Sequence, residues 1–429
     1  MDSAAADGPQ PGSGPAANPL GHGPVLLLTG ARLADGRVVD VRISGDRIQA
    51  VGTAGGLGPL PALPGAPTVT TGARIDLRGY LLLPAPVEAH AHYDVAFSAA
   101  LPAPPPDTST DLTRRVTEAA LTSLGYGATA QRTHVRIGDV HGLRRLEAVL
   151  TAQQALRGLA ELQAVAMPRL LTGRAGADGR AQLREALKLG ATAAGGCPEL
   201  DPDPAGYVQL LLEAAREADC PVDLHTTAAD PGRLARLAGA LAPLRPRVVL
   251  GPCGSLAPGA STVLANAGIR VVCLPQNSGC AGLEGLGPAA GLRPAPLREL
   301  VKARVPLVAG SGSLRDGANP VGRADPLEAA YLLAAGGVLD VEAAYDAVSN
   351  QARLALGLPL VRVDAGFPAE LLAVRGDSLA GALAGGHSRL VVHSGRVVSR
   401  TSAVREFADT VALALPRQSD GTDGRGPNE

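Results

Sequence analysis

Two histidines separated by one residue are the most informative feature of this sequence. His90 and His92 end an apolar run that begins at Tyr80 and is typical of a buried strand. Side chains along an extended strand alternate between its two faces, so residues two apart point to the same side. Two imidazoles on one side of a strand can ligate a single metal ion. The pattern therefore indicates half of a metal site, and the rest of the chain must supply the other half.

Further histidines stand where other predicted strands end. Of the eight histidines in the chain, His134 and His225 join His90 and His92 at such positions. Three imidazoles, from His90, His92 and His225, could hold one divalent ion and leave a coordination position open for water. Histidine suits zinc and iron about equally, so the ligand type leaves the identity of the metal open. Each histidine taken singly has a second interpretation, as a hydrogen-bonded structural residue.

The elements that would position these histidines alternate between strands and helices. In the helix expected near 206–219, Val208, Leu211, Leu212 and Ala215 recur with helical spacing and mark one buried face. Eight such strand-helix units are the count of a (β/α)8 barrel, in which chemistry gathers at the carboxyl ends of the strands. An open doubly wound sheet is the alternative, although no GxGxxG follows the first strand. The candidate strands are 81–89, 128–134, 161–167, 191–196, 221–225, 247–251, 270–274 and 305–310.

The two ends of the chain show a different pattern. Short alternating strands separated by Gly and Asp turns run from Pro24 to Gly52, and similar strands return between Ala369 and Val398. We expect these segments to fold together as one small β-sandwich. The predicted organisation is a disordered segment over 1–22, a β-sandwich from 23–80 plus 360–402, a barrel over 81–359, and a C-terminal tail over 403–429.

Composition and charge exclude several classes of partner. The 39 basic and 40 acidic side chains nearly cancel, so no net field favours nucleic acid or an anionic membrane. With three Phe, six Tyr and no Trp, the chain has few of the aromatic side chains that stack on single strands. No uninterrupted apolar run of about 18 residues is present to cross a bilayer. We expect a small-molecule substrate or ligand, and a homo-oligomer stays open.

Cysteine use and the first residues of the chain bear on its compartment. The five cysteines are scattered, odd in number and without a CxxC pair, which argues against a disulfide framework. Residues 1–22 have neither a basic start nor an apolar core, so they are not expected to act as a signal peptide. Both observations predict a reducing, cytoplasmic environment.

Several segments resemble the cytosine-deaminase-like branch of the amidohydrolase superfamily. The likeness runs in unbroken order from about Val25 to Val398. It implies a metal-dependent barrel flanked by a small β-sandwich, in a family that hydrolyses amino groups from pyrimidine-like rings and related C–N bonds. The segments that carry it are 83–94 (LPAPVEAHAHYD), 127–135 (GATAQRTHV), 223–225 (DLH), 319–328 (NPVGRADPLE) and 348–353 (VSNQAR).

The same resemblance marks positions where this chain departs from the family. The family carries a proton-shuttling Glu three residues after the strand 5 histidine, and this chain has Ala228 there. The family's water-orienting His after strand 6 falls at about Pro252, and its metal-binding, proton-accepting Asp after strand 8 falls at Gly312. Arg169 replaces the family's substrate-amide Gln after strand 3. Because a proton shuttle contributes about 10²–10⁴-fold, the family mechanism cannot run here unchanged.

Further polar residues are candidates for the pocket around the histidines. Asp94 is expected to hydrogen-bond to metal-bound imidazoles and so orient them. His134 is expected to be structural or to lie at the pocket wall, and Gln276 ends strand 7. Glu199 could face a substrate from the loop after strand 4. Asp316 could reach the site if its loop folds inward, and a solvated loop residue or a helix cap is its other interpretation.

Two functions from different classes fit this pattern. The first is an amidohydrolase with an altered site, which hydrolyses a non-peptide C–N bond of a small cyclic substrate through a divalent metal. The second is a catalytically inactive relative that keeps the barrel as a binding or oligomerisation module. The histidines of strands 1 and 5 favour the first, and the losses at Ala228, Pro252 and Gly312 favour the second. A purely structural metal is a third interpretation.

Overall fold

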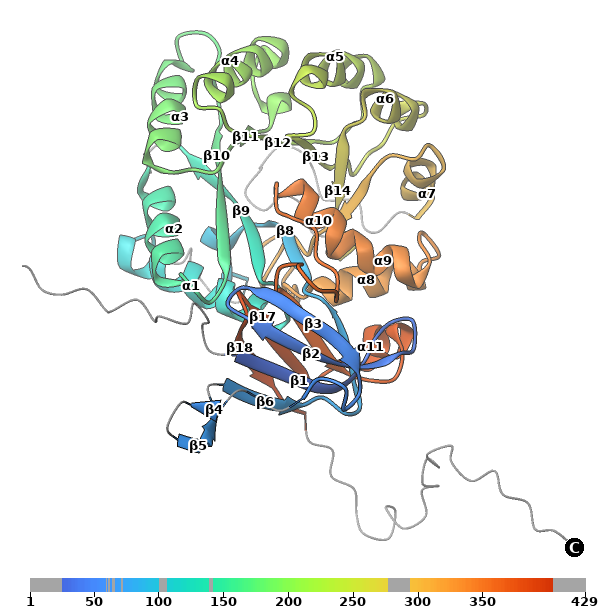
Figure 1. Ribbon diagram of the computed structural model, residues 1–429. Coiled ribbons are helices and arrows are strands. Elements are labelled where there is room, and N and C mark those ends of the chain that lie inside the picture. Colours follow the sequence, from blue (N-terminus) through green and yellow to red (C-terminus); the bar gives the residue numbers. More distant parts are fainter. Residues whose placement is uncertain are drawn as a thin grey trace, which may run out of the picture.

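The structure is a computed structural model that describes residues 25–403 apart from 59, 61, 64–65, 71, 100–105, 139–141 and 277–293. The predicted disordered segment 1–22 lies outside the described residues, as does the predicted tail from residue 404 onward. The described chain forms a parallel barrel with helices around its outside and a smaller β-domain beside it (Figure 1).

Eight strands form the barrel, and neighbours in the chain are neighbours in the sheet. Every pair along it is parallel, and helices alternate with the strands as the sequence predicts. The predicted (β/α)8 fold class is therefore confirmed. The strands are β8 (Val87–Ala91), β9 (Ala130–Ile137), β10 (Glu161–Pro168), β11 (Ala193–Gly196), β12 (Val222–Thr226), β13 (Val248–Pro252), β14 (Arg270–Cys273) and β15 (Leu307–Ala309).

Helices and short 3-10 turns fill the connections between the strands. Each α-helix turns an apolar face toward the barrel, and several start at an aspartate or threonine that caps the first turn. The helices are α1 (Ser109–Gly125), α2 (Arg144–Ala155), α3 (Ala177–Leu189), α4 (Pro204–Glu217), α5 (Pro231–Leu241), α6 (Ala260–Ala267), α7 (Pro294–Lys302), α8 (Pro326–Ala335), α9 (Val341–Val348), α10 (Asn350–Ala355) and α11 (Leu379–Gly385). The 3-10 turns are η1 (Tyr93–Val95), η3 (Pro198–Leu200) and η4 (Ala242–Leu244).

Helix α4 confirms the helical periodicity found in the sequence. Val208, Leu211, Leu212 and Ala215 are all buried on its inner face. Proline is at its first position, where the missing N–H has no partner to lose, and the side chain of Asp203 accepts the Gly206 N–H.

The barrel closes between its first and last strands. Ala91 of β8 forms a parallel bridge with Gly312, just beyond β15, and the Gly312 N–H donates to the His90 carbonyl at 2.9 Å. Closure places the segment after β15 directly beside His90 at the end of β8. The eight strand ends therefore face one another around a ring.

The small β-domain joins the two ends of the chain in one hydrogen-bonded sheet. Its order is β18-β17-β16-β7-β1-β2-β3, with β6 also on β1, and the β7–β16 pair links the N-terminal half to the C-terminal half. Residues from both halves, such as Leu28, Ile43, Leu371 and Val392, share one buried cluster. The strands are β1 (Val25–Arg32), β2 (Val38–Ser44), β3 (Arg47–Thr53), β6 (Gly72–Asp76), β7 (Tyr80–Pro84), β16 (Leu371–Arg375), β17 (Arg389–His393) and β18 (Arg396–Thr401), and β4 (Ala62–Leu63) pairs with β5 (Ala66–Thr70) separately.

The predicted strand 81–89 is in fact two strands in different sheets. Strand β7 ends at Pro84 in the small β-domain, and β8 starts at Val87 in the barrel. Pro84 and Pro86 have no N–H to donate to a ladder, so the run breaks between them. The sequence from Tyr80 to Ala91 nevertheless reads as one apolar run, because the side chains of both strands are largely buried.

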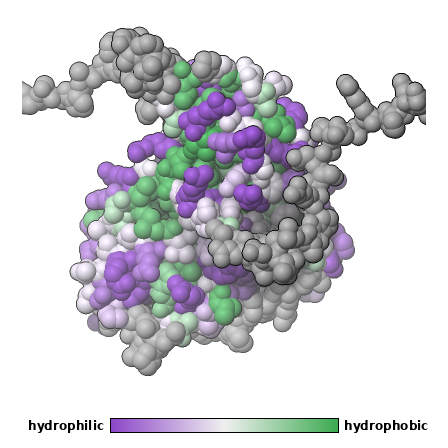
Figure 2. Space-filling model, turned by 90° about the horizontal axis from the view of Figure 1, so that it is seen from below, coloured by the Kyte–Doolittle hydropathy of each residue, from purple (hydrophilic) through white to green (hydrophobic). Residues whose placement is uncertain are grey.

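The outer surface of the small domain mixes hydrophobic and hydrophilic side chains. Seen from below, green and purple residues alternate over short distances (Figure 2). Among the described residues, no helix has the length and apolar character needed to cross a membrane.

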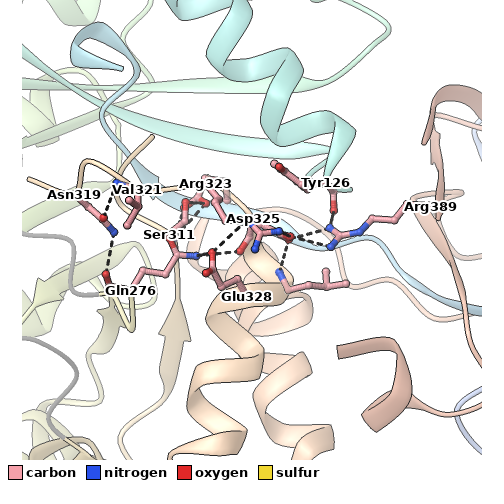
Figure 3. Close-up of polar contacts among 11 residues, drawn as sticks. Tyr126, Gln276, Ser311, Asn319, Val321, Arg323, Asp325, Glu328 and Arg389 are labelled. Atoms are coloured by element: carbon pink, nitrogen blue, oxygen red, sulfur yellow. Dashed lines mark hydrogen bonds and ion pairs between the residues drawn. The ribbon is translucent and has the colours of Figure 1, made fainter. Parts of the chain in front are cut away.

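A buried ion pair ties the small domain to the barrel. Arg389 of β17 binds both carboxylate oxygens of Asp325, at 2.9 and 2.8 Å, and also donates to the Tyr126 carbonyl (Figure 3). Asp325 in turn caps α8 by accepting the Leu327 N–H. The bidentate geometry fixes how α8 meets the sheet.

We predict that Arg389→Met lowers the free energy of unfolding by about 3–5 kcal/mol, because it leaves the Asp325 carboxylate buried and without its main cation. Arg184→Met is the matched control, because its ion pair with Glu217 is exposed and should contribute less than about 1 kcal/mol. Urea unfolding followed by circular dichroism measures both. Equal shifts of the two midpoints would show that the pair does not join the domains.

Candidate metal centre

Four histidines gather inside the carboxyl end of the barrel. His90 is the last residue but one of β8 and His92 directly follows the strand, His134 lies on β9 and His225 on β12, and each is at most 5% exposed. Their ring centroids lie 4.0 to 5.6 Å apart. One ring nitrogen from each of His90, His134 and His225 lies within 4.8 Å of the other two. The four rings lie together, and the group that meets this distance contains His90 and His225 with His134 in place of the predicted His92.

The closest contact in the cluster joins two ring nitrogens, which can share either an N–H···N hydrogen bond or one metal ion. His90 Nε2 lies 3.0 Å from His225 Nε2. Two nitrogen ligands of one ion, each about 2.0–2.1 Å from it, can have this spacing. The Nδ1 atoms of both rings and the Nε2 atom of His92 are buried with no hydrogen-bond partner among the described residues. The donor set therefore fits a divalent metal.

Burial keeps these imidazoles neutral, which is the form that binds metals. Loss of solvent, together with the smaller effect of the neighbouring His134, lowers the pKa of His92 to about 3. Loss of solvent and the adjacent rings also hold the pKa of His90 and of His225 well below the usual value. A metal ion would not have to displace protons from these rings at neutral pH.

His134 is held by a buried charge network below the cluster. Its Nε2 lies 3.2 Å from Asp223 Oδ1, and Arg132 donates to Asp223 Oδ2 at 3.0 Å. Arg132 also donates to the Gln163 side chain. Burial alone would raise the pKa of Asp223, but His134 and Arg132 outweigh it and the pKa is lowered. Asp223 therefore stays ionised and fixes the His134 ring.

Glu88 holds the backbone of His90 in place by hydrogen bonds. Its carboxylate accepts the N–H of His90 at 3.1 Å and the N–H of Ser311 at 3.0 Å, and also binds the Ser311 hydroxyl. Burial raises the pKa of Glu88 to about 7. Glu88 thus fastens β8 to the segment after β15, next to the closure at Gly312.

The positions where the chain departs from the family carry no acid or base in the structure. Ala228 is buried with a φ of +56°, and its N–H donates to Thr226 Oγ1. Pro252 ends β13, and Gly312 has a φ of +77°. Among the described residues, the only cluster of candidate metal ligands contains imidazoles alone. A carboxylate ligand is not part of it.

Two predicted pocket carboxylates bind other partners. Asp94 is buried and pairs with Arg145 at 3.0 Å, while its carbonyl accepts from Arg115. It therefore contacts arginines where we expected imidazoles. Glu199 accepts the hydroxyls of Thr226 and Thr227 at 2.7 and 2.8 Å, so its carboxylate clamps the end of β12.

The remaining predicted pocket residues lie on the loops around the barrel mouth. Gln276 donates to Glu328 at 2.8 Å and accepts from Asn319 (Figure 3). Asp316 is fully buried, and its Oδ1 accepts the N–H groups of the two residues that begin the next turn, Ala318 and Asn319. Burial raises the pKa of Asp316. Arg169 is exposed.

The residues that sequence reasoning missed are Glu88, Asp223 and Arg132. Strand alternation could have found two of them, because Glu88 is two residues before His90 and Asp223 is two residues before His225. Arg132 carries the same signal, two residues before His134. A charged residue thus stands two positions before three of the four histidines, namely His90, His134 and His225.

Comparisons with known proteins show which proteins this chain is similar to. No family model matches the chain. A curated N-isopropylammelide isopropyl amidohydrolase from Pseudomonas sp. (strain ADP) is 27% identical over 183 residues, which are 35% of this chain and 43% of that relative. The match therefore spans less than half of the relative's length.

Two solved structures cover nearly the whole described chain. N-isopropylammelide isopropylaminohydrolase from Burkholderia multivorans ATCC 17616 superposes with a TM-score of 0.73 at 26% identity, over 88% of this chain and 99% of that one. The chain belongs to the amidohydrolase superfamily. The 5-methylcytosine deaminase of Klebsiella pneumoniae superposes with a TM-score of 0.72 at 21% identity, over 90% and 100% of the two chains, and at this identity it shows the fold. The resemblance stated from the sequence is confirmed at the level of the superfamily.

We predict that the metal-free protein loses stability as the pH falls from 7 to 5. The unfolded chain takes up protons on His90, His92 and His225 near pH 6.5, whereas the folded chain does not until the pH is much lower. Glu88 acts in the opposite direction below pH 7, but it is one group against three.

The variant His92→Asn should reduce this acid destabilisation, by an amount on the order of 2–4 kcal/mol at pH 4. Thermal unfolding in the presence of a chelator, repeated across pH, measures the effect. An unchanged pH profile in His92→Asn would contradict the assignment of His92 as a buried neutral imidazole.

Proposed function

We propose that this chain is a metal-dependent amidohydrolase that cleaves a non-peptide C–N bond of a small cyclic substrate. The buried cluster of neutral imidazoles at the barrel mouth is the observation that carries the proposal. The names of the relatives support the substrate class, because they give N-isopropylammelide and 5-methylcytosine as the molecules acted on. A nitrogen heterocycle with an exocyclic amino or alkylamino group is therefore the expected substrate.

The proposed metal ligands are His90, His92 and His225, and zinc or iron is the proposed metal. The buried Nε2 of His92 has no hydrogen-bond partner among the described residues, whereas the Nε2 of His134, although also without a hydrogen bond of good geometry, lies 3.2 Å from a carboxylate oxygen of Asp223. The geometry that brings His134 within 4.8 Å of His90 and His225 makes it the alternative third ligand. When bound, a zinc ion held by imidazoles lowers the pKa of a water ligand to about 7 and acts as a Lewis acid.

The chain's own residues hold and orient this site. Glu88 fixes the backbone of His90, and Asp223 with Arg132 fixes the ring of His134. Glu199 holds Thr226, the residue after His225. These contacts position the imidazoles before any ligand arrives. Outer contacts of this kind orient metal ligands.

A second candidate is a binding protein without turnover. The specific observation in its favour is the absence of a side chain that could move a proton at Ala228, Pro252 and Gly312. Such a protein would keep the metal and the small-molecule pocket but would release no product. Metal content alone does not separate the two candidates, so activity must be measured as well.

We predict that His90→Asn and His225→Asn abolish tight zinc binding and that His92→Asn weakens it at least about tenfold, since each removes a nitrogen ligand. His134→Asn is the matched control and should change the affinity less than about threefold. Competition with a chromophoric chelator measures the affinity of each variant. The reverse order for His92 and His134 would make His134 the third ligand.

We predict slow hydrolysis of aminopyrimidines or N-alkylamino triazines by the zinc-loaded protein. Restoring the lost groups in the double variant Ala228→Glu, Gly312→Asp should raise the rate by about 10²-fold or more. Aspartate is among the side chains that tolerate the positive φ at Gly312. The double variant Ala228→Gln, Gly312→Asn is the matched control, because it adds similar volume without a proton-transferring carboxylate.

Released ammonia or amine is the readout of this experiment. The absence of turnover from both the native chain and the double variant, with one metal bound to each, would contradict the hydrolase proposal. It would favour the binding protein.

A further inference from the structure

A second cavity lies outside the barrel, between α4 and α5. It has a volume of about 520 Å³, and its walls include Val208, Leu212, Leu234 and Leu237. These four side chains are buried and belong to the helix faces that meet here. The volume and the apolar lining are those of small-molecule sites.

The cavity is separate from the histidine cluster although the two share a strand. Thr226 lines the cavity and follows His225 on β12. Because side chains alternate along a strand, Thr226 points toward the helices while His225 points into the barrel. An occupant of the cavity would therefore lie against the outer side of the strand that carries His225, and the cavity continues past the end of that strand to Ala228.

The acidic side chains of the cavity are already hydrogen-bonded within the chain. Glu199 accepts four hydrogen bonds from Thr226 and Thr227. Asp203 caps α4, and Asp230 caps α5 by accepting the Arg233 N–H. The hydrogen bonds that these carboxylates accept thus come from groups of the chain itself.

The basic side chains of the cavity, in contrast, have no hydrogen bonds or ion pairs within the described chain. Arg216, Arg233 and Arg236 line it, and within the described residues none of their guanidinium groups has a hydrogen bond or an ion pair. Asp230 feels the charges of Arg233 and Arg236, which help to lower its pKa, but neither guanidinium binds it. A guanidinium has five N–H donors and no acceptor. Among the charged side chains of the lining, those without a partner in the described chain are therefore these three arginines, whose guanidinium groups are exposed to solvent.

We propose that this cavity binds a small organic anion with an apolar body, such as a medium-chain carboxylate. The apolar body lies against the leucine and valine side chains of α4 and α5, and the anionic group accepts from Arg233 and Arg236. An ammonium of the same length has no acceptor for these arginines and binds more weakly. The site does not depend on the proposed hydrolase activity.

Isothermal titration of the full chain with octanoate tests the proposal. We expect one site per chain for octanoate and at least about tenfold weaker binding of octylamine, because only the carboxylate can accept from the guanidinium groups. Acetate, which could reach a metal but has no apolar body, should not bind the cavity. Equal affinity for octanoate and octylamine, or no binding of octanoate, would overturn the proposal.

Variants of the lining residues test whether octanoate binds in this cavity. The double variant Arg233→Ala, Arg236→Ala should weaken octanoate binding at least about tenfold, and Ala240→Phe should abolish it by filling the cavity from an exposed position. Arg157→Ala, an exposed arginine outside the cavity, is the matched control and should leave the affinity unchanged. If Ala240→Phe keeps the unfolding midpoint of the native chain and still binds octanoate normally, the ligand lies elsewhere and the proposal fails.

Discussion

The closure of the barrel between β8 and the segment after β15 is the constraint on which the site depends. The Gly312 N–H donates to the His90 carbonyl, and Glu88 binds both the N–H and the hydroxyl of Ser311. These bonds hold β8 in one register against the last strand. Because a slip of one residue would turn every side chain of β8 to the other face, the register decides that His90 points inward. His225 then meets it from across the barrel.

Closure also determines the electrostatics of the site. A closed, filled barrel excludes water from the imidazoles, and the loss of solvent keeps them neutral. The same exclusion would be costly for unpaired charges, so the charged groups near the histidines are paired or hydrogen-bonded. Asp223 has Arg132, and Asp94 has Arg145. A buried cluster of neutral nitrogens of this kind could hold a cation.

Much of this arrangement could be predicted from the sequence, because it rests on local periodicity. The alternation of strand and helix gives the barrel, and the spacing of His90 and His92 gives two imidazoles near one another. The break at Pro84 and Pro86 was missed because both flanking strands are buried and apolar. Contacts between residues far apart in the sequence could not be predicted from the local sequence pattern either. Asp94 finds Arg145 on another helix, and His134 comes close to His90 only because β8 and β9 are neighbours in a curved sheet.

The central claim is that the buried imidazoles of this chain hold one divalent metal. X-ray absorption at the zinc edge of the zinc-loaded protein tests it most directly. The account predicts a first shell of nitrogen or oxygen at about 2.0–2.1 Å, with the outer-shell scattering of about three imidazole rings. A sulfur shell at about 2.3 Å, or the absence of imidazole scattering, would contradict it.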